Sequence, residues 1–312
     1  MRVVVVGAGA MGSLFAAGLA RTGEVVWVYD TWREHVEAIR RDGLRVAREG
    51  GEDVVSLRAT TDPGEPGAAD LVLVFVKHAH TRQAIADARP LVRDDTTVVT
   101  VQNGLGNVEI LAAAVPPDRL LYGLTTLTSE LRGAGRIEAS FKGRGETYLW
   151  PLDGRPGPRA DAVVALFNRA GIRTELAPDI QARIWKKLIV NCGLNTVCAL
   201  SGLTVGALAA RPEAWPLLDA IAGEIVEVGR RKGIPLEAGD ARRYLRAVAA
   251  EAQEHAPSML VDIRHGRRTE IDCLNAAVVR EGDALGADTP TNRAMTALIR
   301  LLEARTGPAP RD

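Results

Sequence analysis

The polar residues best placed to do chemistry in this chain lie in an otherwise apolar stretch, "IWKKLIVNCGLN". We expect a helix over residues 179–200 around it. Lys187, Asn191 and Asn195 follow one another at intervals of four residues, so one helix face carries all three. Asn is unfavourable inside a helix because its amide competes for backbone hydrogen bonds. An amine and two amides here predict one wall of a site for a small polar ligand, with a solvent-facing stripe as the alternative.

A second polar cluster lies in "HAPSMLVDIRHGRRTEID", residues 255–272. Ser258 offers a hydroxyl and Glu270 a carboxylate, and Gly266 between them allows the chain to turn. We therefore expect both side chains to face one cleft. The alternatives are structural: Ser258 as the cap of the helix that follows, and Glu270 as an acid in the first turn of a helix.

A third cluster follows two strands that we expect to be parallel. Lys77 comes directly after "LVLVFV" (71–76), and Asn103 lies in "QNGLG" after "TTVVTV" (96–101). Open α/β sheets bind ligands at the carboxyl ends of their parallel strands. Lys77 and Asn103 are therefore predicted to be ligand-binding residues, and a simple turn at Asn103 is the alternative.

The N-terminal stretch "VVVVGAGAMG" predicts a dinucleotide site. Gly7, Gly9 and Gly12 fit the pattern Gly-x-Gly-x-x-Gly, directly after a buried strand and at the start of a helix. In such a turn the first glycine allows the bend, the second lets the backbone approach the pyrophosphate, and the third lets helix and strand pack closely. The predicted cofactor-binding residues of this turn are Gly7, Ala8, Gly9, Ala10, Met11 and Gly12.

Asp30, at the end of the second expected strand, bears on the choice of cofactor. A carboxylate at this offset accepts a hydrogen bond from the ribose 2′-hydroxyl of NAD and repels the 2′-phosphate of NADP. Arg33, three residues later, is a possible partner for that phosphate. The residues therefore favour NADH and leave NADPH open.

The elements that position these residues alternate between strand and helix in the first half of the chain. Residues 44–59 predict a small hairpin, and residues 136–150 predict antiparallel strands. From Asp179 onwards the periodicity predicts helices alone, with a proline at 178 before the capping Asp179. We expect a Rossmann-type doubly wound α/β sheet in a dinucleotide-binding domain (1–178), followed by an all-α domain (179–312) for substrate binding and dimerisation.

The composition predicts a globular protein with small-molecule partners. The chain has 312 residues and a formal net charge of +0, so neither nucleic acid nor a membrane surface is an expected partner. The N-terminus does not have the pattern of a signal peptide, which makes the cytoplasm the expected location. The three cysteines, Cys192, Cys198 and Cys273, form no Cys-x-x-Cys pair and are expected to be buried thiols rather than metal ligands.

Taken together, the motifs resemble ketopantoate reductase (2-dehydropantoate 2-reductase) over essentially the whole chain. The resemblance is carried by "GAGAMG" (7–12), "VKHAH" (76–80), "QNGLG" (102–106), "WKKLIVNCGLN" (185–195) and "SMLVDIRHGRRTEID" (258–272). It implies a Rossmann domain, a helical domain, an active site in the cleft between them, and a homodimer. It also implies NADPH as the reductant, so that Asp30 departs from the basic residue that many members have there. Val205 likewise lies near a position that is a substrate-binding Asn in some members.

The resemblance also implies roles for individual residues. Lys187 matches the lysine that donates a proton to the ketone oxygen, and Glu270 matches an acid that contacts the cofactor and helps to fix the reacting groups. Lys77, Asn103 and Thr128 match residues that contact the cofactor. The implied substrate-binding residues are Asn103, Lys187, Asn191, Asn195 and Ser258.

The activity that the resemblance implies is reduction of 2-dehydropantoate to (R)-pantoate by NAD(P)H, in pantothenate and coenzyme A biosynthesis. A related alternative is a D-mandelate-type dehydrogenase that uses NAD and acts on another 2-oxo acid. An alternative of another class is a protein that senses NAD(P) without catalysis. A sensor needs no proton donor, so the stripe with Lys187 argues against this last possibility.

Overall fold

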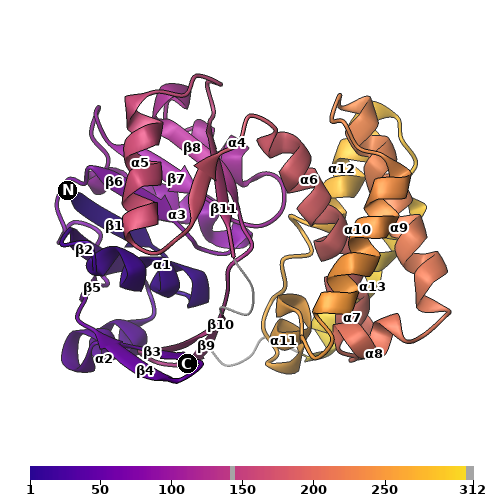
Figure 1. Ribbon diagram of the computed structural model, residues 1–312, viewed down its shortest axis with the longest axis horizontal. Coiled ribbons are helices and arrows are strands. Elements are labelled where there is room, and N and C mark those ends of the chain that lie inside the picture. The colour runs from indigo at the N-terminus through magenta and orange to yellow at the C-terminus, as the bar shows by residue number, and fades with distance from the viewer. Residues whose placement is uncertain (141–144, 307–312) are drawn as a thin grey trace. The chain divides into compact units, whose positions relative to one another are not determined.

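The structure is a computed structural model that describes residues 1–140 and 145–306. It divides into two compact units (Figure 1). The first consists of residues Met1–Gln102 and Asn107–Ile180, and the second of Asn103–Gly106 with the described part of Gln181–Asp312. The loop 103–106 thus groups with the helical residues that follow much later in the chain.

The first unit contains an eight-stranded sheet. Its strands are β1 (Arg2–Val6), β2 (Val25–Tyr29), β5 (Arg58–Thr60), β6 (Leu71–Val74), β7 (Thr97–Thr100), β8 (Leu120–Thr125), β11 (Thr147–Pro151) and β12 (Thr174–Leu176). Their order is β12-β11-β8-β7-β6-β1-β2-β5, and the described neighbours run parallel except for β8 and β11. In the middle of the sheet, Val4 of β1 pairs with Trp27 of β2 on one side and with Val72 of β6 on the other. This is the predicted doubly wound sheet, with β1 in the interior.

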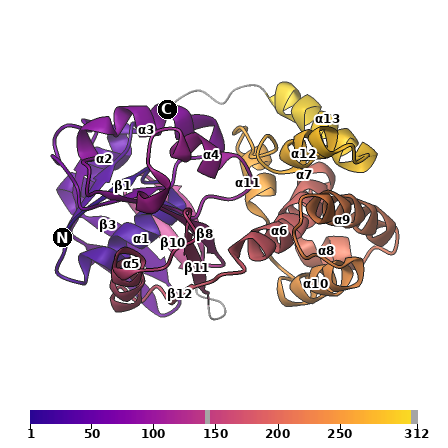
Figure 2. The ribbon, with the colours of Figure 1, turned by 90° about the horizontal axis from the view of Figure 1, so that it is seen from above.

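Helices cover both faces of this sheet because its central strands are apolar on both sides. The helices are α1 (Ala10–Ala20), α2 (Arg33–Asp42), α3 (Thr81–Asp87), α4 (Asn107–Ala112) and α5 (Pro158–Arg169), with short 3₁₀ turns at His78–His80, Arg89–Leu91 and Pro117–Arg119. Val3 and Val5 pack on the side of α1 and α5, whereas Val4 and Val6 pack on the side of α3 and α4. Figure 2 shows these two helix layers on either side of the strands.

A second, four-stranded sheet packs against α1. It consists of β3 (Leu44–Arg48), β4 (Gly51–Val55), β9 (Thr128–Gly133) and β10 (Arg136–Ser140), in the order β4-β3-β10-β9. The predicted hairpin over 44–59 is confirmed for β3 and β4, but it extends too far, because residues 58–60 form β5 at the edge of the large sheet. Within residues 136–150, β10 pairs antiparallel with β9 and β11 pairs antiparallel with β8 in the other sheet. Residues 141–144 between β10 and β11 lie outside the described part of the chain.

The second unit is helical throughout its described residues. It contains most of α6 (Ile180–Val190), a π-helical turn (Asn191–Asn195), α7 (Thr196–Ser201), α8 (Val205–Ala209), α9 (Ala214–Arg231), α10 (Ala238–Glu251), α11 (Ser258–Arg264), α12 (Asn275–Leu285) and α13 (Pro290–Thr306). Figure 1 shows α9 beside α10 and α12 beside α13. Trp185 and Leu188 of α6 are buried in its core together with Ile225 of α9. No helix in residues 1–140 and 145–306 is long and apolar enough to cross a membrane.

Two helix predictions for this unit need correction. Residues 179–200 were expected to form one α-helix, but the π-helical turn interrupts it and α7 continues it. Helices alone were expected from Asp179 onwards, but α12 begins only at Asn275, after a turn in which the carbonyl oxygen of Glu270 accepts from the backbone N–H of Cys273 and Leu274. The short helix α8 was not predicted.

Candidate functional site

The glycine-rich turn after β1 has the geometry of a dinucleotide turn. Gly7 has a φ of +96°, and a Cβ added to it would lie 2.8 Å from the backbone nitrogen of Val76. A Cβ on Gly12, in the first turn of α1, would lie 1.9 Å from the carbonyl oxygen of Gly7. The fold itself therefore requires these two glycines, one for its backbone conformation and one for the close approach of helix and turn.

Gly9 differs from these two residues, because nothing in the fold requires a glycine there. Its φ of −62° is open to any residue, and outside its chain neighbours no described atom lies within 4 Å of an added Cβ. Gly9 is the N-cap of α1, whose first-turn N–H groups and positive dipole end attract anions. The space above Gly9 thus fits a pyrophosphate approaching the backbone, as in the Gly-x-Gly-x-x-Gly turn.

Asp30 holds this turn in place. One of its carboxylate oxygens accepts a hydrogen bond from the backbone N–H of Ala8 at 2.6 Å, and the other accepts one from the N–H of Trp32 at 2.9 Å. The carboxylate therefore joins the glycine turn to the start of α2. A carboxylate oxygen can accept more than one hydrogen bond, so these two leave capacity for a ribose hydroxyl. Arg33 is the exposed first residue of α2.

Two further predicted cofactor residues lie in the first unit. Lys77 is exposed directly before the 3₁₀ turn at His78–His80, three residues beyond the end of β6. Thr128 is exposed as the first residue of β9 and therefore belongs to the smaller sheet. Both residues remain predictions as cofactor ligands.

The helical unit brings three of the predicted site residues together. Lys187, near the end of α6, donates from Nζ to Oδ1 of Asn103 at 2.8 Å. The Nδ2 atom of Asn103 lies 3.5 Å from Oε2 of Glu270. The amide thus stands between the amine and the carboxylate, and residues that are far apart in the sequence form one polar cluster, which we call the Lys187 cluster (Lys187, Asn103 and Glu270).

A close backbone approach carries Asn103 into this cluster. The next residue, Gly104, has a φ of +79°, and a Cβ there would lie 2.3 Å from the carbonyl oxygen of Cys273. That carbonyl accepts a hydrogen bond from the backbone N–H of Leu105 at 2.8 Å. The "QNGLG" loop therefore lies against the turn that contains Glu270. A glycine is needed at 104 because a side chain there would collide with the backbone of Cys273, so the residue does more than allow a simple turn.

The electrostatics of Lys187 suit a proton donor. Burial lowers the pKa of its ammonium from the ordinary value of 10.5 to about 8, and the charge of Glu270 opposes this shift. Near neutral pH the amine is therefore still charged but gives up its proton much more easily than a surface lysine. Lys186, by contrast, is exposed and stacks over the ring of Tyr244 at 4.5 Å.

Asn191 and Asn195 both belong to the π-helical turn. Nδ2 of Asn195 donates to Oδ1 of Asn191 at 3.2 Å, and Asn191 is buried while Asn195 is half-buried. The two amides are neighbours, as their spacing predicted. The π-helical turn was not predicted, and the one signal for it in the sequence is the pair of Asn residues in an apolar helix. Such turns occur frequently at functional sites.

The alternatives for the second cluster are not supported. Ser258 is the exposed first residue of α11, and the cap position is Pro257, so Ser258 does not cap this helix. Glu270 precedes α12 by five residues and is not an acid of its first turn. Val205 is buried in α8. Glu270 therefore belongs to the Lys187 cluster, whereas no described contact joins Ser258 to it.

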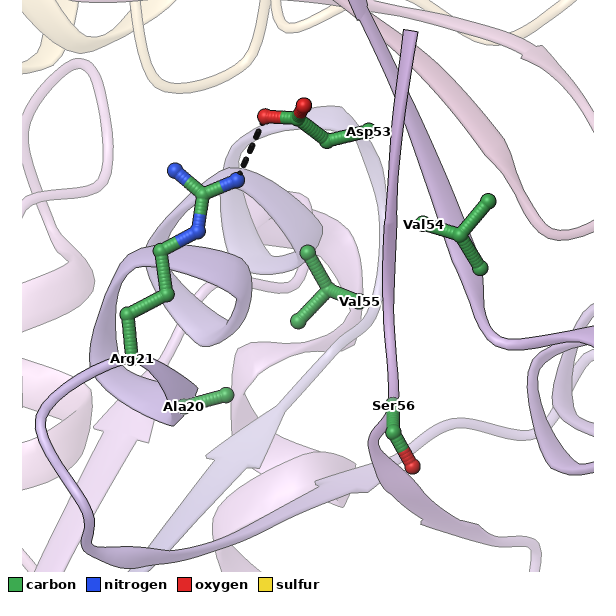
Figure 3. Close-up of a pocket in the computed structure, with 6 residues that line it drawn as sticks. All are labelled: Ala20, Arg21, Asp53, Val54, Val55 and Ser56. Atoms are coloured by element: carbon green, nitrogen blue, oxygen red, sulfur yellow. Dashed lines mark hydrogen bonds and ion pairs between the residues drawn. The ribbon is translucent and has the colours of Figure 1, made fainter.

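Other candidate sites are weaker. The described residues contain no group of three potential metal ligands, and all three thiols are buried. A surface hollow lined by the end of α1 and by β4 lies around an ion pair of 2.7 Å between Arg21 and Asp53 (Figure 3). It lies at the opposite end of α1 from Gly9, about 16 Å along the helix. This hollow is therefore separate from the predicted dinucleotide turn.

Known proteins resemble this chain along its whole length. The family model described as ketopantoate reductase PanE/ApbA matches residues 3–154, and the model for the C-terminal part of the same family matches residues 179–303. A 2-dehydropantoate 2-reductase of Halobacterium salinarum is 36% identical, with 97% of this chain and 99% of the relative covered.

Two solved structures have nearly the same fold. A PanE/ApbA family ketopantoate reductase from Ralstonia eutropha is 31% identical with a TM-score of 0.90, and the match covers 98% of this chain and 99% of that one. A D-mandelate dehydrogenase, solved with NADH and anilino(oxo)acetate, is 28% identical with a TM-score of 0.92 over the same shares of the two chains.

The doubly wound sheet with its glycine turn and the helical unit with its half-buried lysine define a two-part dinucleotide-binding oxidoreductase. The full-length family match then makes the assignment more specific. The chain belongs to the ketopantoate reductase family.

Proposed function

We propose that this protein reduces 2-dehydropantoate to (R)-pantoate with a reduced nicotinamide dinucleotide. The observation that carries the proposal is the Lys187 cluster: Nζ of the half-buried Lys187 donates to Oδ1 of Asn103 at 2.8 Å, beside Glu270, and desolvation lowers the pKa of this amine to about 8. Full-length relatives named 2-dehydropantoate 2-reductase support the choice of substrate.

In the proposed reaction the reduced nicotinamide supplies a hydride to C2 of the oxo acid. Negative charge then grows on the ketone oxygen, and the charged Nζ of Lys187 stabilises it and gives it a proton, which leaves a hydroxyl group. Asn103 accepts from Nζ and so holds the amine in one direction. Glu270 favours the charged form of Lys187, which keeps it protonated before the transfer.

Residues of the two units have separate binding tasks in this proposal. The glycine turn 7–12 and Asp30 hold the dinucleotide through its pyrophosphate and ribose, while Lys77 and Thr128 add contacts to it. Asn191 and Asn195 bind the hydroxyl and carboxylate of the substrate, and Ser258 donates one more hydrogen bond to the carboxylate. Paired amides suit this task because each offers both donors and an acceptor.

The test is an assay of NADH and NADPH oxidation with a panel of 2-oxo acids that includes 2-dehydropantoate. We expect 2-dehydropantoate to have the highest kcat/KM. A preference for 2-oxo acids with bulky apolar side chains would instead favour a D-mandelate-type activity, which the similarity to D-mandelate dehydrogenase keeps as the second candidate. Dinucleotide binding without oxidation across the panel would contradict both.

We further propose that NADH is the preferred reductant. The support is Asp30, whose charge disfavours a 2′-phosphate and whose position is fixed by the N–H groups of Ala8 and Trp32. Asp30→Asn removes the charge while keeping the shape, so we expect it to lower the ratio of kcat/KM for NADH to that for NADPH. Arg33→Ala is the matched variant. If wild-type protein prefers NADPH and Arg33→Ala abolishes the preference, Arg33 rather than Asp30 decides the specificity.

A further inference from the structure

A buried amide outside the proposed substrate-binding set makes two of its three hydrogen bonds to residues of the π-helical turn and directly after it. Asn275, the first residue of α12, is fully buried. Its Nδ2 donates to the carbonyl oxygen of Cys192 at 3.1 Å and to Oδ1 of Asn292 at 3.0 Å, and its Oδ1 accepts from the hydroxyl of Thr196 at 2.8 Å. Both amide hydrogens are thus used, and the bonds reach both ends of the turn.

Asn292, one of the hydrogen-bond partners of Asn275, is itself held in place by other residues. Asn292, also fully buried, donates from Nδ2 to Oε2 of Glu224 at 2.7 Å. The carboxylate of Glu224 in addition accepts from the backbone N–H groups of Thr291 and Asn292 in the first turn of α13. Asn275 is therefore held by a chain of paired polar groups that runs to α9 and α13, and it cannot rotate without leaving buried partners unpaired.

The π-helical turn needs such support because an α-helix is the default for the same residues. π-helical turns are rare, and here the carbonyl of Cys192 within the turn accepts from the side chain of Asn275. Cys192 lies directly after Asn191, and Thr196 directly after Asn195. The two contacts of Asn275 thus fall beside the two amides, whose Nδ2 and Oδ1 atoms lie 3.2 Å apart.

We propose that Asn275 is a positioning residue for the oxo acid: it stabilises the π-helical turn and thereby sets the directions of Asn191 and Asn195. Asn275 itself touches neither substrate nor dinucleotide. The inference rests on the proposed function in one respect, namely that Asn191 and Asn195 bind the substrate. Because Lys187 precedes the turn in α6, the loss of Asn275 affects substrate binding more than proton donation.

The test compares Asn275→Ala and Thr196→Val with Thr296→Val as a matched control. Thr296 is a buried threonine in α13 whose hydroxyl donates to the carbonyl oxygen of Asn292 at 2.8 Å, a bond within its own helix. We expect Asn275→Ala to raise KM for the oxo acid about ten- to a hundredfold, as for a small misplacement of binding groups. We expect Thr196→Val to raise it about tenfold, in keeping with one buried hydrogen bond.

In both variants kcat and the dinucleotide Kd should stay within about threefold of wild type, a split that a loss of stability alone does not produce. Thr296→Val should lower Tm and leave KM unchanged. If Asn275→Ala does not fold, Thr196→Val alone decides. An unchanged KM in Thr196→Val, or an equal rise in Thr296→Val, overturns the inference.

Crystal structures of wild type and Thr196→Val make the outcome independent of the substrate. We expect the hydrogen bond between Asn191 and Asn195 to be broken in the variant, and an unchanged π-helical turn would contradict the inference. If wild-type protein turns over no 2-oxo acid, the proposed function fails, and this comparison of the turn still decides the role of Asn275.

Discussion

Replacing Lys187 by Met should make the protein more stable and almost inactive at the same time. Met has a similar length and an uncharged thioether chain without an amine. A fall of the pKa from 10.5 to about 8 means that the charged amine costs the folded chain about 3 kcal/mol at neutral pH. The variant loses the hydrogen bond to Asn103, which contributes about 1 kcal/mol. The expected net gain in the free energy of unfolding is therefore about 2 kcal/mol.

The same change removes the proposed proton donor. General acids contribute about a hundred- to ten-thousandfold to rates, so we expect kcat to fall by that factor. The dinucleotide Kd should change little, because the glycine turn belongs to the other unit. Urea unfolding at pH 7 measures the stability, and steady-state oxidation of the reduced dinucleotide measures kcat.

Lys186→Met is the matched control one residue away. Lys186 is exposed, and its charge lies over the ring of Tyr244 at 4.5 Å, a contact that contributes about 0.5–1 kcal/mol. This variant should be slightly less stable and fully active. Two results would refute the reasoning: near-wild-type kcat in Lys187→Met excludes the proton donor, and a variant less stable than wild type shows that the amine is not desolvated.

Four further predictions follow from the structure. Because proton donation needs the charged amine, kcat/KM for reduction should be constant below pH 8 and fall about tenfold per pH unit above it. Between pH 8 and 10.5 the unfolded chain holds a proton on Lys187 that the folded chain has released, so this residue makes the free energy of unfolding rise with pH. The difference between the urea-unfolding free energies of wild type and Lys187→Met, measured across this pH range, isolates the rise. Gly9→Ala should weaken dinucleotide binding without lowering Tm, whereas Gly12→Ala should lower Tm, because only a Cβ at residue 12 collides with the fold. Equal losses of Tm in the two variants would contradict this prediction. Burial raises the pKa of the Cys198 thiol to about 12 and also raises the pKa of the Cys192 and Cys273 thiols. A thiol-reactive disulfide reagent should therefore label the native protein far more slowly than the urea-unfolded protein. Rapid labelling of the native protein would disprove the burial.

Local sequence patterns were sufficient for much of the fold. The run of valines at 2–6 is apolar on both sides and therefore had to be an interior strand, and the glycine pattern after it depends on residues that are neighbours along the chain. The spacing of Asn191 and Asn195 predicted that they lie together for the same reason. Errors occurred where contacts between distant segments decide: residues 58–60 pair with β2 at the edge of the large sheet, and α12 begins five residues after Glu270.

The sequence by itself determined the kinds of groups available for catalysis and the backbone turn for a dinucleotide, because both depend on residue type and short-range spacing. Only the tertiary structure decided that Asn103 lies between Lys187 and Glu270, since this depends on the packing of the 103–106 loop against Cys273. The charge of Glu270, which partly offsets the effect of burial on the pKa of Lys187, also comes from a residue distant in sequence. The π-helical turn, with the amide of Asn275 bonded to both ends, is likewise a product of packing rather than of helix propensity.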